Sequence, residues 1–288
     1  MRISKKFIKV LLKKYDARPL KRLGQNFLID KSVIKKTVEA AELEPDDVVL
    51  EIGPGIGVLT QELARGVKKV IALEKDLKMI EILKETLGNL KNVEILKGDI
   101  LKLDPKSYIL KPYKIVANLP FYLTALVIRK FLESRQVAPG KMVLIVQKEV
   151  GQRICAKPPK MSILAISVQF YAKTEVISYV SKKSFWPQPK VNGAIIKITP
   201  IKLQRTGLCK LFFRIVKVGF SQPRKQLINN LSRLNFSSKN LTGQVKNLKA
   251  NRGKVKIWLL KNKIQPTQRA ETLSLKDWLK LTKSCKPR

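Results

Sequence analysis

Residues 48–57 read Val48-Val49-Leu50-Glu51-Ile52-Gly53-Pro54-Gly55-Ile56-Gly57, an apolar run that leads into three glycines. The apolar, β-branched run predicts a buried strand. Glycine lets the following turn adopt positive φ and approach a ligand closely, and the N-terminus of the helix predicted behind it favours an anionic group. The segment therefore predicts a strand, a glycine-rich turn and a helix, the order with which an open α/β sheet forms a ligand site.

Apolar runs and helical stretches alternate around this segment. The predicted strands cover residues 47–52, 69–73, 93–96, 114–117 and 142–147, and the predicted helices cover 30–41, a stretch ending near 65, 76–87 and 123–132. Strands separated by helices indicate a mostly parallel sheet with helices on both faces, an α/β fold. Residues 163–170, 175–180 and 191–198 lack long helices between them and are predicted to be strands that close one edge of the sheet.

Three segments are expected along the 288 residues. Residues 1–22 predict a basic, poorly ordered and partly helical arm. Residues 23–202 predict the α/β domain, and residues 203–288 a small, basic, helical C-terminal domain. This length suits one large domain and one small one.

The charge of the chain is strongly positive. Lys and Arg number 59 against 21 Asp and Glu, a formal net charge of +38, and residues 201–288 hold 22 basic and 2 acidic side chains. Such a field favours a polyanionic partner, with nucleic acid ahead of a membrane surface. A lysine-rich proteome is the alternative, but it explains the abundance of Lys better than the near absence of acids after residue 201.

The chain contains no histidine and three widely spaced cysteines, Cys155, Cys209 and Cys285. The lack of histidine excludes Ser-His-Asp triads and HExxH zinc sites. The cysteine spacing predicts neither a metal site nor a disulfide framework, so a cytoplasmic protein is expected. Lysines interrupt the apolar stretches near the N-terminus, and neither a signal peptide nor a membrane contact is expected.

Acidic and amide side chains are expected where the strands end. Glu74 ends the second strand, where an acid can bind ribose hydroxyls, and Asp99 ends the third, where it can accept a hydrogen bond from an adenine amine. A dinucleotide would prefer the G-x-G-x-x-G spacing around its pyrophosphate, whereas this chain has G-x-G-x-G. S-adenosylmethionine, which carries adenosine and an amino-acid end without phosphate, is therefore the predicted cofactor.

The fourth strand runs into Asn118-Leu119-Pro120-Phe121. The Asn118 side-chain oxygen and the Leu119 carbonyl can accept hydrogen bonds from an exocyclic amine, Pro120 restricts the backbone, and Phe121 offers a face for stacking. The tetrapeptide thus suits a nucleobase with an amine, although in isolation its pattern favours a plain strand-to-helix turn.

Seven segments of the chain occur in the order found in one enzyme family. They are residues 24–28 (Gly-Gln-Asn-Phe-Leu), 51–55 (Glu-Ile-Gly-Pro-Gly), 98–99 (Gly-Asp), 118–121 (Asn-Leu-Pro-Phe), 147–150 (Gln-Lys-Glu-Val), 185–191 (Phe-Trp-Pro-Gln-Pro-Lys-Val) and 220–225 (Phe-Ser-Gln-Pro-Arg-Lys). Over about residues 20–235 the chain resembles the rRNA adenine N6-dimethyltransferases, and among them the class that acts on small-subunit (16S) rRNA. The resemblance implies a Rossmann-like class I methyltransferase sheet with a small helical C-terminal domain. It also implies S-adenosylmethionine-dependent dimethylation of two adjacent adenines near the 3′ end of 16S rRNA, on the immature 30S subunit.

The resemblance also implies roles for individual residues. Asn26, Leu28, Gly53, Gly55, Glu74, Asp99 and Asn118 would bind the cofactor, and Asn118, Leu119, Phe121 and Phe185 would hold the target base, although core packing is the competing interpretation of Phe185. Arg214, Lys217, Arg224, Lys225 and Arg233 would contact RNA phosphates, unless they form only a solvated basic face. No metal is implied, and the lack of an apolar stripe favours a monomer.

The chain departs from the family pattern at several positions, and rival functions remain open. Phe121 stands where the family usually has Tyr, residues 157–162 replace a Gly- and Tyr-containing loop, Asn192-Gly193 replaces a small hydroxyl residue, and Pro223 stands where an Arg is common. The rivals are the 23S rRNA dimethyltransferases that confer macrolide resistance, a non-catalytic rRNA-binding assembly factor, and DNA adenine methylation. The segments at 185–191 and 220–225 favour the 16S enzyme, and the intact site residues argue against a non-catalytic factor.

Overall fold

The computed structural model describes residues 4–104, 112–134, 137–201, 208–239, 245–249 and 252–285, and of residues 235–239 and 245–249 only the backbone. By its internal contacts the chain divides into two units, Met1–Gln152 with Tyr171–Ile201, and Arg153–Phe170 with Lys202–Arg288. The expected domain boundary after residue 202 lies outside the described residues. Residues 153–170, which the sequence analysis places in the first domain, group with the C-terminal unit.

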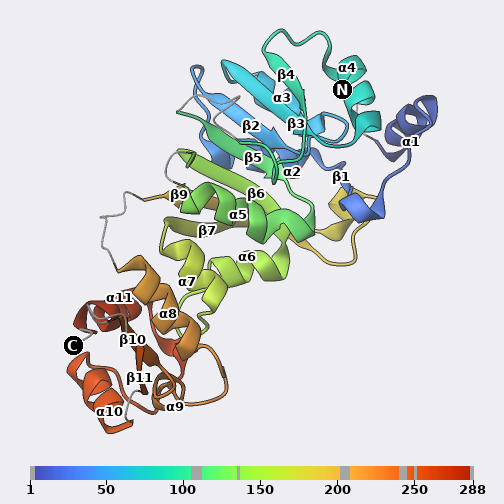
Figure 1. Cartoon of the computed structure of the whole chain (residues 1–288). Helices are drawn as coiled ribbons and strands as arrows, with labels where there is room; N and C mark the ends of the chain where they lie inside the picture. Colours follow the sequence, from blue (N-terminus) through green and yellow to red (C-terminus); the bar gives the residue numbers. More distant parts are fainter. Residues whose placement is uncertain are drawn as a thin grey trace. The chain divides into compact units, whose positions relative to one another are not determined.

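A sheet of seven strands, in the order β4-β3-β2-β5-β6-β9-β7, forms the first unit (Figure 1). Its strands are β2 (Val48–Ile52), β3 (Lys69–Glu74), β4 (Val93–Lys97), β5 (Lys114–Asn118), β6 (Lys141–Gln147), β7 (Ala172–Val180) and β9 (Gly193–Pro200). Strands β4, β3, β2, β5 and β6 are parallel, whereas β9 pairs antiparallel with both β6 and β7. A separate pair, β1 (Phe27–Leu28) and β8 (Phe185–Trp186), is antiparallel. The expected α/β class is thereby confirmed.

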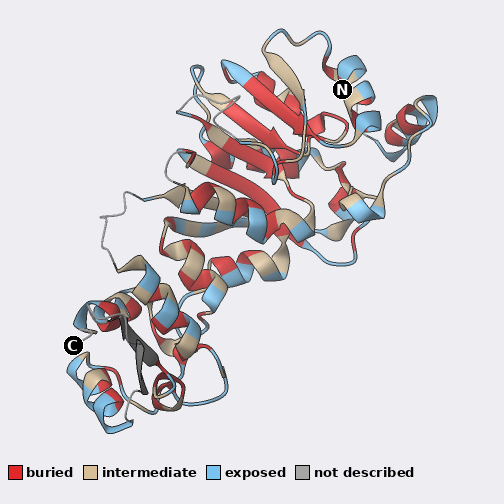
Figure 2. Cartoon of the chain, viewed as in Figure 1, coloured by how far each residue is buried: buried red, intermediate tan, exposed pale blue. Residues whose placement is uncertain are grey.

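Burial follows from the composition of the strands. Strands β2, β3, β5 and β6 are apolar along nearly their whole length and are buried, as Figure 2 shows, whereas β7 at the edge alternates between exposed and half-buried positions. Central parallel strands are covered on both faces, which requires continuous apolar runs. The expected strands at 47–52, 69–73, 93–96, 114–117 and 142–147 are confirmed within one or two residues.

Aspartate caps mark the start of two helices of the first unit. The helices are α1 (Lys5–Lys14), α2 (Lys31–Ala41), α3 (Val58–Ala64), α4 (Leu77–Leu87), α5 (Thr124–Glu133) and most of α6 (Lys148–Ile154). Short 3₁₀ turns lie at Lys21–Leu23, Phe121–Leu123 and Lys182–Ser184. Asp30 accepts a hydrogen bond from the Ser32 amide, and Asp76 accepts one from the Lys78 amide. Each carboxylate satisfies an amide that the first helical turn leaves free.

Residues 163–170 are mostly a helix, α7 (Ile163–Gln169), so the predicted strand is wrong. The Ser162 hydroxyl caps the Ala165 amide at 3.1 Å. Ala165 and Ile166 face inward, one helical turn beyond the buried Met161. The β-branched residues suggested a strand, but the cap and this spacing fit a helix better.

The N-terminal arm contains the helix α1, which packs into the core of the first unit. Ile8, Leu11 and Leu12 are buried, and Lys14 pairs with Glu85 on α4 at 2.7 Å. The apolar residues recur at helical spacing while the lysines point to solvent, so a basic composition is compatible with an ordered amphipathic helix.

The second unit is mainly helical. Its further elements are α8 (Cys209–Gly219), α9 (Leu227–Leu231), α10 (Arg252–Lys261), a 3₁₀ turn at Ala270–Thr272, α11 (Leu275–Ser284) and the antiparallel pair β10 (Asn235–Lys239) and β11 (Val245–Lys249). Trp278 on α11 is fully buried and packs on Phe220 at 5.6 Å between ring centroids. Met161, in one of the loops that departs from the family pattern, donates its amide to the Glu271 carbonyl at 2.9 Å. The two-stranded pair adds to the helical domain that the sequence predicts.

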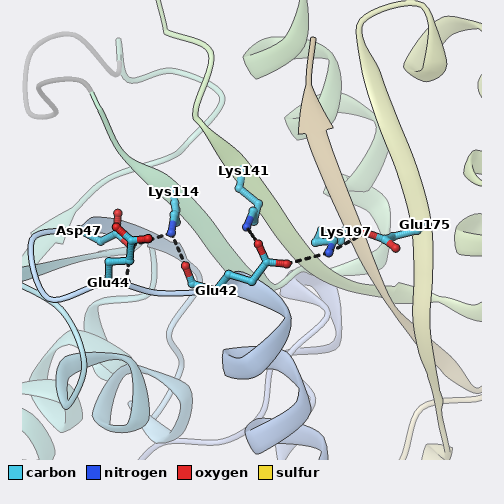
Figure 3. Close-up of polar contacts among 7 residues, drawn as sticks. All are labelled: Glu42, Glu44, Asp47, Lys114, Lys141, Glu175 and Lys197. Atoms are coloured by element: carbon cyan, nitrogen blue, oxygen red, sulfur yellow. Dashed lines mark hydrogen bonds and ion pairs between the residues drawn. The ribbon is translucent and has the colours of Figure 1, made fainter.

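Ion pairs connect the end of α2 to the side of the sheet where the parallel strands begin (Figure 3). The Glu42 carboxylate contacts the ammonium of Lys141 on β6 and that of Lys197 on β9, the latter at 3.0 Å. Lys197 also pairs with Glu175 at 2.7 Å, and Lys114 pairs with Asp47 at 2.7 Å. The ammonium groups of Lys141 and Lys197 lower the pKa of Glu42 to about 2.

We expect Glu42→Gln to destabilise the protein at pH 7 and to lose this effect in acid. The pKa of Glu42 is lowered on folding, so its contribution is present above the ordinary carboxyl pKa of 4.5 and disappears as the pH falls toward 2. Thermal denaturation of both proteins at pH 7, 4 and 3 should therefore give a difference in Tm that shrinks with acid. Glu39→Gln is the control, because Glu39 makes only an exposed pair with Lys35 within α2. A difference that is constant with pH would contradict the expectation.

Candidate cofactor and substrate site

A cavity of about 180 Å³ lies where β2, β3 and β5 end. It is lined by every cofactor and target-base residue that the sequence analysis names: Asn26, Leu28, Gly53, Gly55, Glu74, Asp99, Asn118, Leu119, Phe121 and Phe185. These residues come from distant parts of the chain. The parallel strands bring most of them together where the strands end, and the separate pair of β1 and β8 contributes Leu28 and Phe185. Their individual roles stay predictions.

The glycine turn after β2 forms one wall of the cavity. Gly53 and Gly55 adopt φ values of 70° and 60°, which other residues rarely adopt. A Cβ atom on Gly55 would lie 3.1 Å from the ring of Phe27. The turn therefore needs glycine both for its conformation and for the space beside it.

The Glu74 carboxylate is 7% exposed and holds the turn in place. Its Oε2 accepts a hydrogen bond from the Gly55 amide at 3.2 Å, and its Oε1 accepts from the amides of Lys75 and Asp76 at 2.8 and 2.9 Å. Burial raises the pKa of Glu74, and the three amides oppose that shift. A carboxylate has about four acceptor positions, so Glu74 keeps capacity for a ligand hydroxyl.

Asp99 pairs with Lys75, which is not among the residues predicted for the site. Lys75 Nζ lies 2.8 Å from Asp99 Oδ2, and the Leu101 amide donates to Asp99 Oδ1 at 3.0 Å. The hydrogen bond from Lys75 lowers the pKa of Asp99, so this carboxylate is ionised and acts as an acceptor. The position of Lys75 directly after Glu74 at a strand end was the available signal.

The orientation of the Asn118 amide follows from a single contact. Its Nδ2 donates to the Asn26 carbonyl at 2.9 Å, which fixes the side-chain oxygen as the free acceptor of the amide. The next amide, of Leu119, donates to the Ile145 carbonyl at 3.2 Å and continues the pairing of β5 with β6. The cavity thus presents an oriented amide oxygen on a rigid backbone.

Aromatic side chains complete the cavity. Phe121 is half-buried in the 3₁₀ turn that precedes α5, and Tyr122 is 53% exposed at the rim. Phe185 is 2% exposed and belongs to the apolar core as well as to the cavity lining. Phe185 therefore packs in the core and also faces the site.

Glu51 is a further cavity residue, 1% exposed, whose Oε2 has no hydrogen-bond partner among the described residues. Burial raises the pKa of Glu51 to about 8. A buried acceptor without a partner is costly unless a ligand satisfies it. The Glu51 carboxyl can accept a hydrogen bond from a ligand ammonium group, and Glu74 and Asp99 can accept from an adenosine. Together with the glycine turn, these groups fit S-adenosylmethionine, which carries both an ammonium group and an adenosine.

We expect Glu51→Gln to stabilise the unliganded protein increasingly as the pH rises from 4.5 to 8. In this range the folded protein keeps the Glu51 proton and the unfolded chain loses it, so the wild type loses stability with rising pH. A pKa difference of this size corresponds to a few kcal/mol. Thermal denaturation at pH 5.5 and 8.5 measures the effect, with the exposed Glu81→Gln as control. An effect of Glu51→Gln that is the same at both pH values would contradict a protonated Glu51.

The basic residues predicted to bind RNA are all exposed on the second unit. Arg214 and Lys217 lie on α8, and the others follow α8 or α9: Arg224, Lys225 and Arg233. No ion pair involves any of the five within the described part of the chain. On α8 the apolar residues Phe212, Ile215 and Val216 face the core, so the helix presents its cations to solvent.

Among the described residues there is no group of three or more acidic or cysteine side chains placed to hold a metal ion. No helix in the same part of the chain is long and apolar enough to span a membrane.

The family model described as ribosomal RNA adenine dimethylase matches residues 18–286. A protein of Dehalococcoides mccartyi named ribosomal RNA small subunit methyltransferase A is 39% identical over 277 residues, which cover 95% of this chain and 90% of that protein. The protein of that name from Alkaliphilus metalliredigens is 38% identical, over 98% of this chain and 96% of the relative.

Solved structures have the same fold. A dimethyladenosine transferase from Plasmodium falciparum has a TM-score of 0.71 and 28% identity, covering 88% of this chain and 95% of its own. The 23S rRNA methyltransferase ErmE has a TM-score of 0.73 and covers 90% of this chain and 99% of its own, but at 24% identity its similarity concerns the fold alone. The expectation of a Rossmann-like methyltransferase sheet is confirmed.

Proposed function

The chain belongs to the ribosomal RNA adenine dimethylase family, and we propose that it dimethylates N6 of two adjacent adenines near the 3′ end of 16S rRNA with S-adenosylmethionine. The small-subunit relatives match nearly the whole chain. The observation that carries the proposed chemistry is the Asn118 amide, whose nitrogen is held by the Asn26 carbonyl and whose oxygen is thereby left to accept from a substrate amine.

The target amine is a weak nucleophile because its lone pair is delocalised into the purine ring. Hydrogen bonds from the amine to the Asn118 oxygen and the Leu119 carbonyl would favour a tetrahedral nitrogen with a localised lone pair. This is catalysis by positioning and electrostatic stabilisation, and it needs neither histidine nor a general base. The bound cofactor supplies an activated methyl group as its sulfonium.

Residues at the strand ends would hold that cofactor. Glu74 would accept hydrogen bonds from the ribose hydroxyls. Asp99 would accept one from the adenine amine, which would replace the ammonium of Lys75 as its donor. Glu51 would face the ammonium group at the amino-acid end of the cofactor. Gly53 and Gly55 would let the backbone approach the ligand, with Asn26 and Leu28 at its border.

The target base would leave its stack and enter beside Phe121 and Phe185. Flipping costs a few kcal/mol, and stacking on an aromatic ring returns about 1–3 kcal/mol. Because these energies are comparable, the net affinity for RNA would come from charge. The exposed cations Arg214, Lys217, Arg224, Lys225 and Arg233 would supply part of it through phosphates.

Methyl-transfer assays with labelled cofactor test the proposed function. The wild type should label 16S rRNA in immature 30S subunits, and should not label 23S rRNA or duplex DNA. Labelling of 23S rRNA would instead support the macrolide-resistance class, and absence of any transfer would support a non-catalytic assembly factor. An enzyme that acts on 30S subunits would be cytoplasmic, and we propose this location for the protein. We also propose that it acts as a monomer, which light scattering of the purified protein tests.

A further inference from the structure

An open hollow lies on the first unit, beside the segment that carries Phe185. Its lining includes Lys148 at the start of α6, Lys182 after β7, Lys190 between β8 and β9, and Glu149. None of these residues belongs to the cavity or to the basic residues of the second unit described above.

Asn192 ties the walls of the hollow together. Its Oδ1 accepts a hydrogen bond from the Lys182 amide at 3.0 Å, and its carbonyl accepts from the Lys148 amide at 2.9 Å. The adjacent Gly193 pairs with Gln147 in the antiparallel register of β9 and β6. The loop residues of the hollow are therefore anchored at Asn192, directly before the first residue of β9.

One of the lysines makes a cation–π contact with an exposed aromatic ring. Lys148 Nζ lies 5.0 Å from the centroid of the Tyr179 ring, and Tyr179 is 53% exposed on the edge strand β7. Gln152 donates to the Tyr179 hydroxyl at 3.4 Å. Cations combined with an exposed aromatic ring are typical of sites that bind a single nucleic-acid strand.

The charge of the hollow is not compensated within the described residues. Lys148, Lys182 and Lys190 make no ion pair there, and Glu149 is the one carboxylate in the lining. At the opposite edge of the same sheet, Lys114, Lys141 and Lys197 are each paired with a carboxylate (Figure 3). Lysines without a carboxylate partner, on the side of the sheet where the cavity lies, favour an anionic ligand on that side.

The segment that contributes Lys182 and Lys190 to the hollow also contributes a residue to the target-base cavity. Phe185, which lines the cavity, lies between Lys182 and Lys190, and its strand β8 pairs with β1, which contributes Phe27 and Leu28 to the cavity. A strand of RNA whose base enters the cavity would therefore have its neighbouring backbone near the hollow.

We propose that the hollow binds the phosphodiester backbone of the rRNA strand next to the target adenine, through Lys148, Lys182 and Lys190. This inference rests on the proposed function, since it assumes that the cavity receives a base of rRNA. It assigns to the catalytic domain an RNA contact in addition to those of the basic C-terminal unit.

The test compares Lys182→Gln/Lys190→Gln with Lys68→Gln/Lys91→Gln in the full-length protein. The control pair removes the same charge at two exposed lysines that lie just before the first residues of β3 and β4, at the ends of these strands away from the cavity. Binding of a protein-free RNA hairpin with the 3′ sequence of 16S rRNA is measured at several salt concentrations. The first pair should weaken binding roughly tenfold relative to the control and reduce the salt slope by about 0.7 for each lost phosphate contact. Cofactor affinity and turnover at saturating RNA should not change.

Aromatic variants give a second measurement. Tyr179→Leu removes the ring that positions the Lys148 ammonium and should weaken RNA binding, whereas Tyr179→Phe keeps the ring and should not. Equal RNA affinity and salt slope in the lysine pair and its control would overturn the inference. A loss seen with 30S subunits but not with protein-free RNA would also overturn it, because the partner would then be a ribosomal protein. A wild type that binds the hairpin but methylates no rRNA would refute the proposed function instead.

Discussion

Asn118→Ala should lose methyl transfer by about 10²–10³-fold while its affinity for S-adenosylmethionine stays close to that of the wild type, because the other six residues expected to bind the cofactor remain in place. Removal of one preorganised polar group that acts on the transition state has an effect of this size. The amide nitrogen is held at 2.9 Å by the Asn26 carbonyl, so the oxygen needs no reorganisation when the amine arrives. Single-turnover kinetics with labelled cofactor measure the transfer, and calorimetry measures the cofactor affinity.

Asn92→Ala is the matched control for this prediction. Asn92 also donates its amide to backbone carbonyls, those of Ala64 and Val67 at 2.8 and 3.0 Å, but it does not line the cavity. We expect this control to be less stable and to keep its turnover per folded molecule. If Asn118→Ala methylates at nearly the wild-type rate, the assigned role of the amide is wrong.

The sheet could be predicted from the sequence because its signals are local. Each central strand is an apolar run long enough to be buried on both faces, and Asp30 and Asp76 mark the helix starts that their caps confirm. The α7 helix was missed because Ile163, Ile166 and Val168 suggest a strand, whereas its cap at Ser162 is a weaker signal in a sequence. Partly helical structure in the N-terminal arm could be predicted, but its order could not, because the lysines of α1 outweigh the three residues that this helix buries.

The candidate site could be predicted as a set of residues but not as a set of contacts. Strand ends identify Glu74, Asp99 and Asn118, because parallel strands of an open sheet end at one edge. The bond between Asn118 and Asn26 joins positions 92 residues apart, and no local pattern reports it. The pairing of Lys75 with Asp99 likewise depends on the register of β3 with β4.

Glu74→Ala should weaken S-adenosylmethionine binding by about 10- to 100-fold. A hydrogen bond to a charged group contributes about 1.5–3 kcal/mol, and about 1.4 kcal/mol corresponds to a factor of ten in affinity. The substitution also leaves the amides of Gly55, Lys75 and Asp76 without their acceptor, so the glycine turn loses the group that holds it. Both effects act on the cofactor, in contrast to Asn118→Ala, which acts on the transfer step.

Calorimetric titration with S-adenosylhomocysteine separates the two variants, because this ligand has the adenosine and amino-acid ends but no methyl group to transfer. Glu74→Ala should bind it weakly and Asn118→Ala should bind it nearly as well as the wild type. Glu62→Ala removes an exposed carboxylate on α3 that pairs with Arg65, and it should leave the affinity unchanged. Equal affinities of Glu74→Ala and Glu62→Ala would place the ribose elsewhere. A buried carboxylate that accepts from the Gly55 amide of the glycine turn and from two amides after β3 cannot be removed without effect if the ligand lies against it.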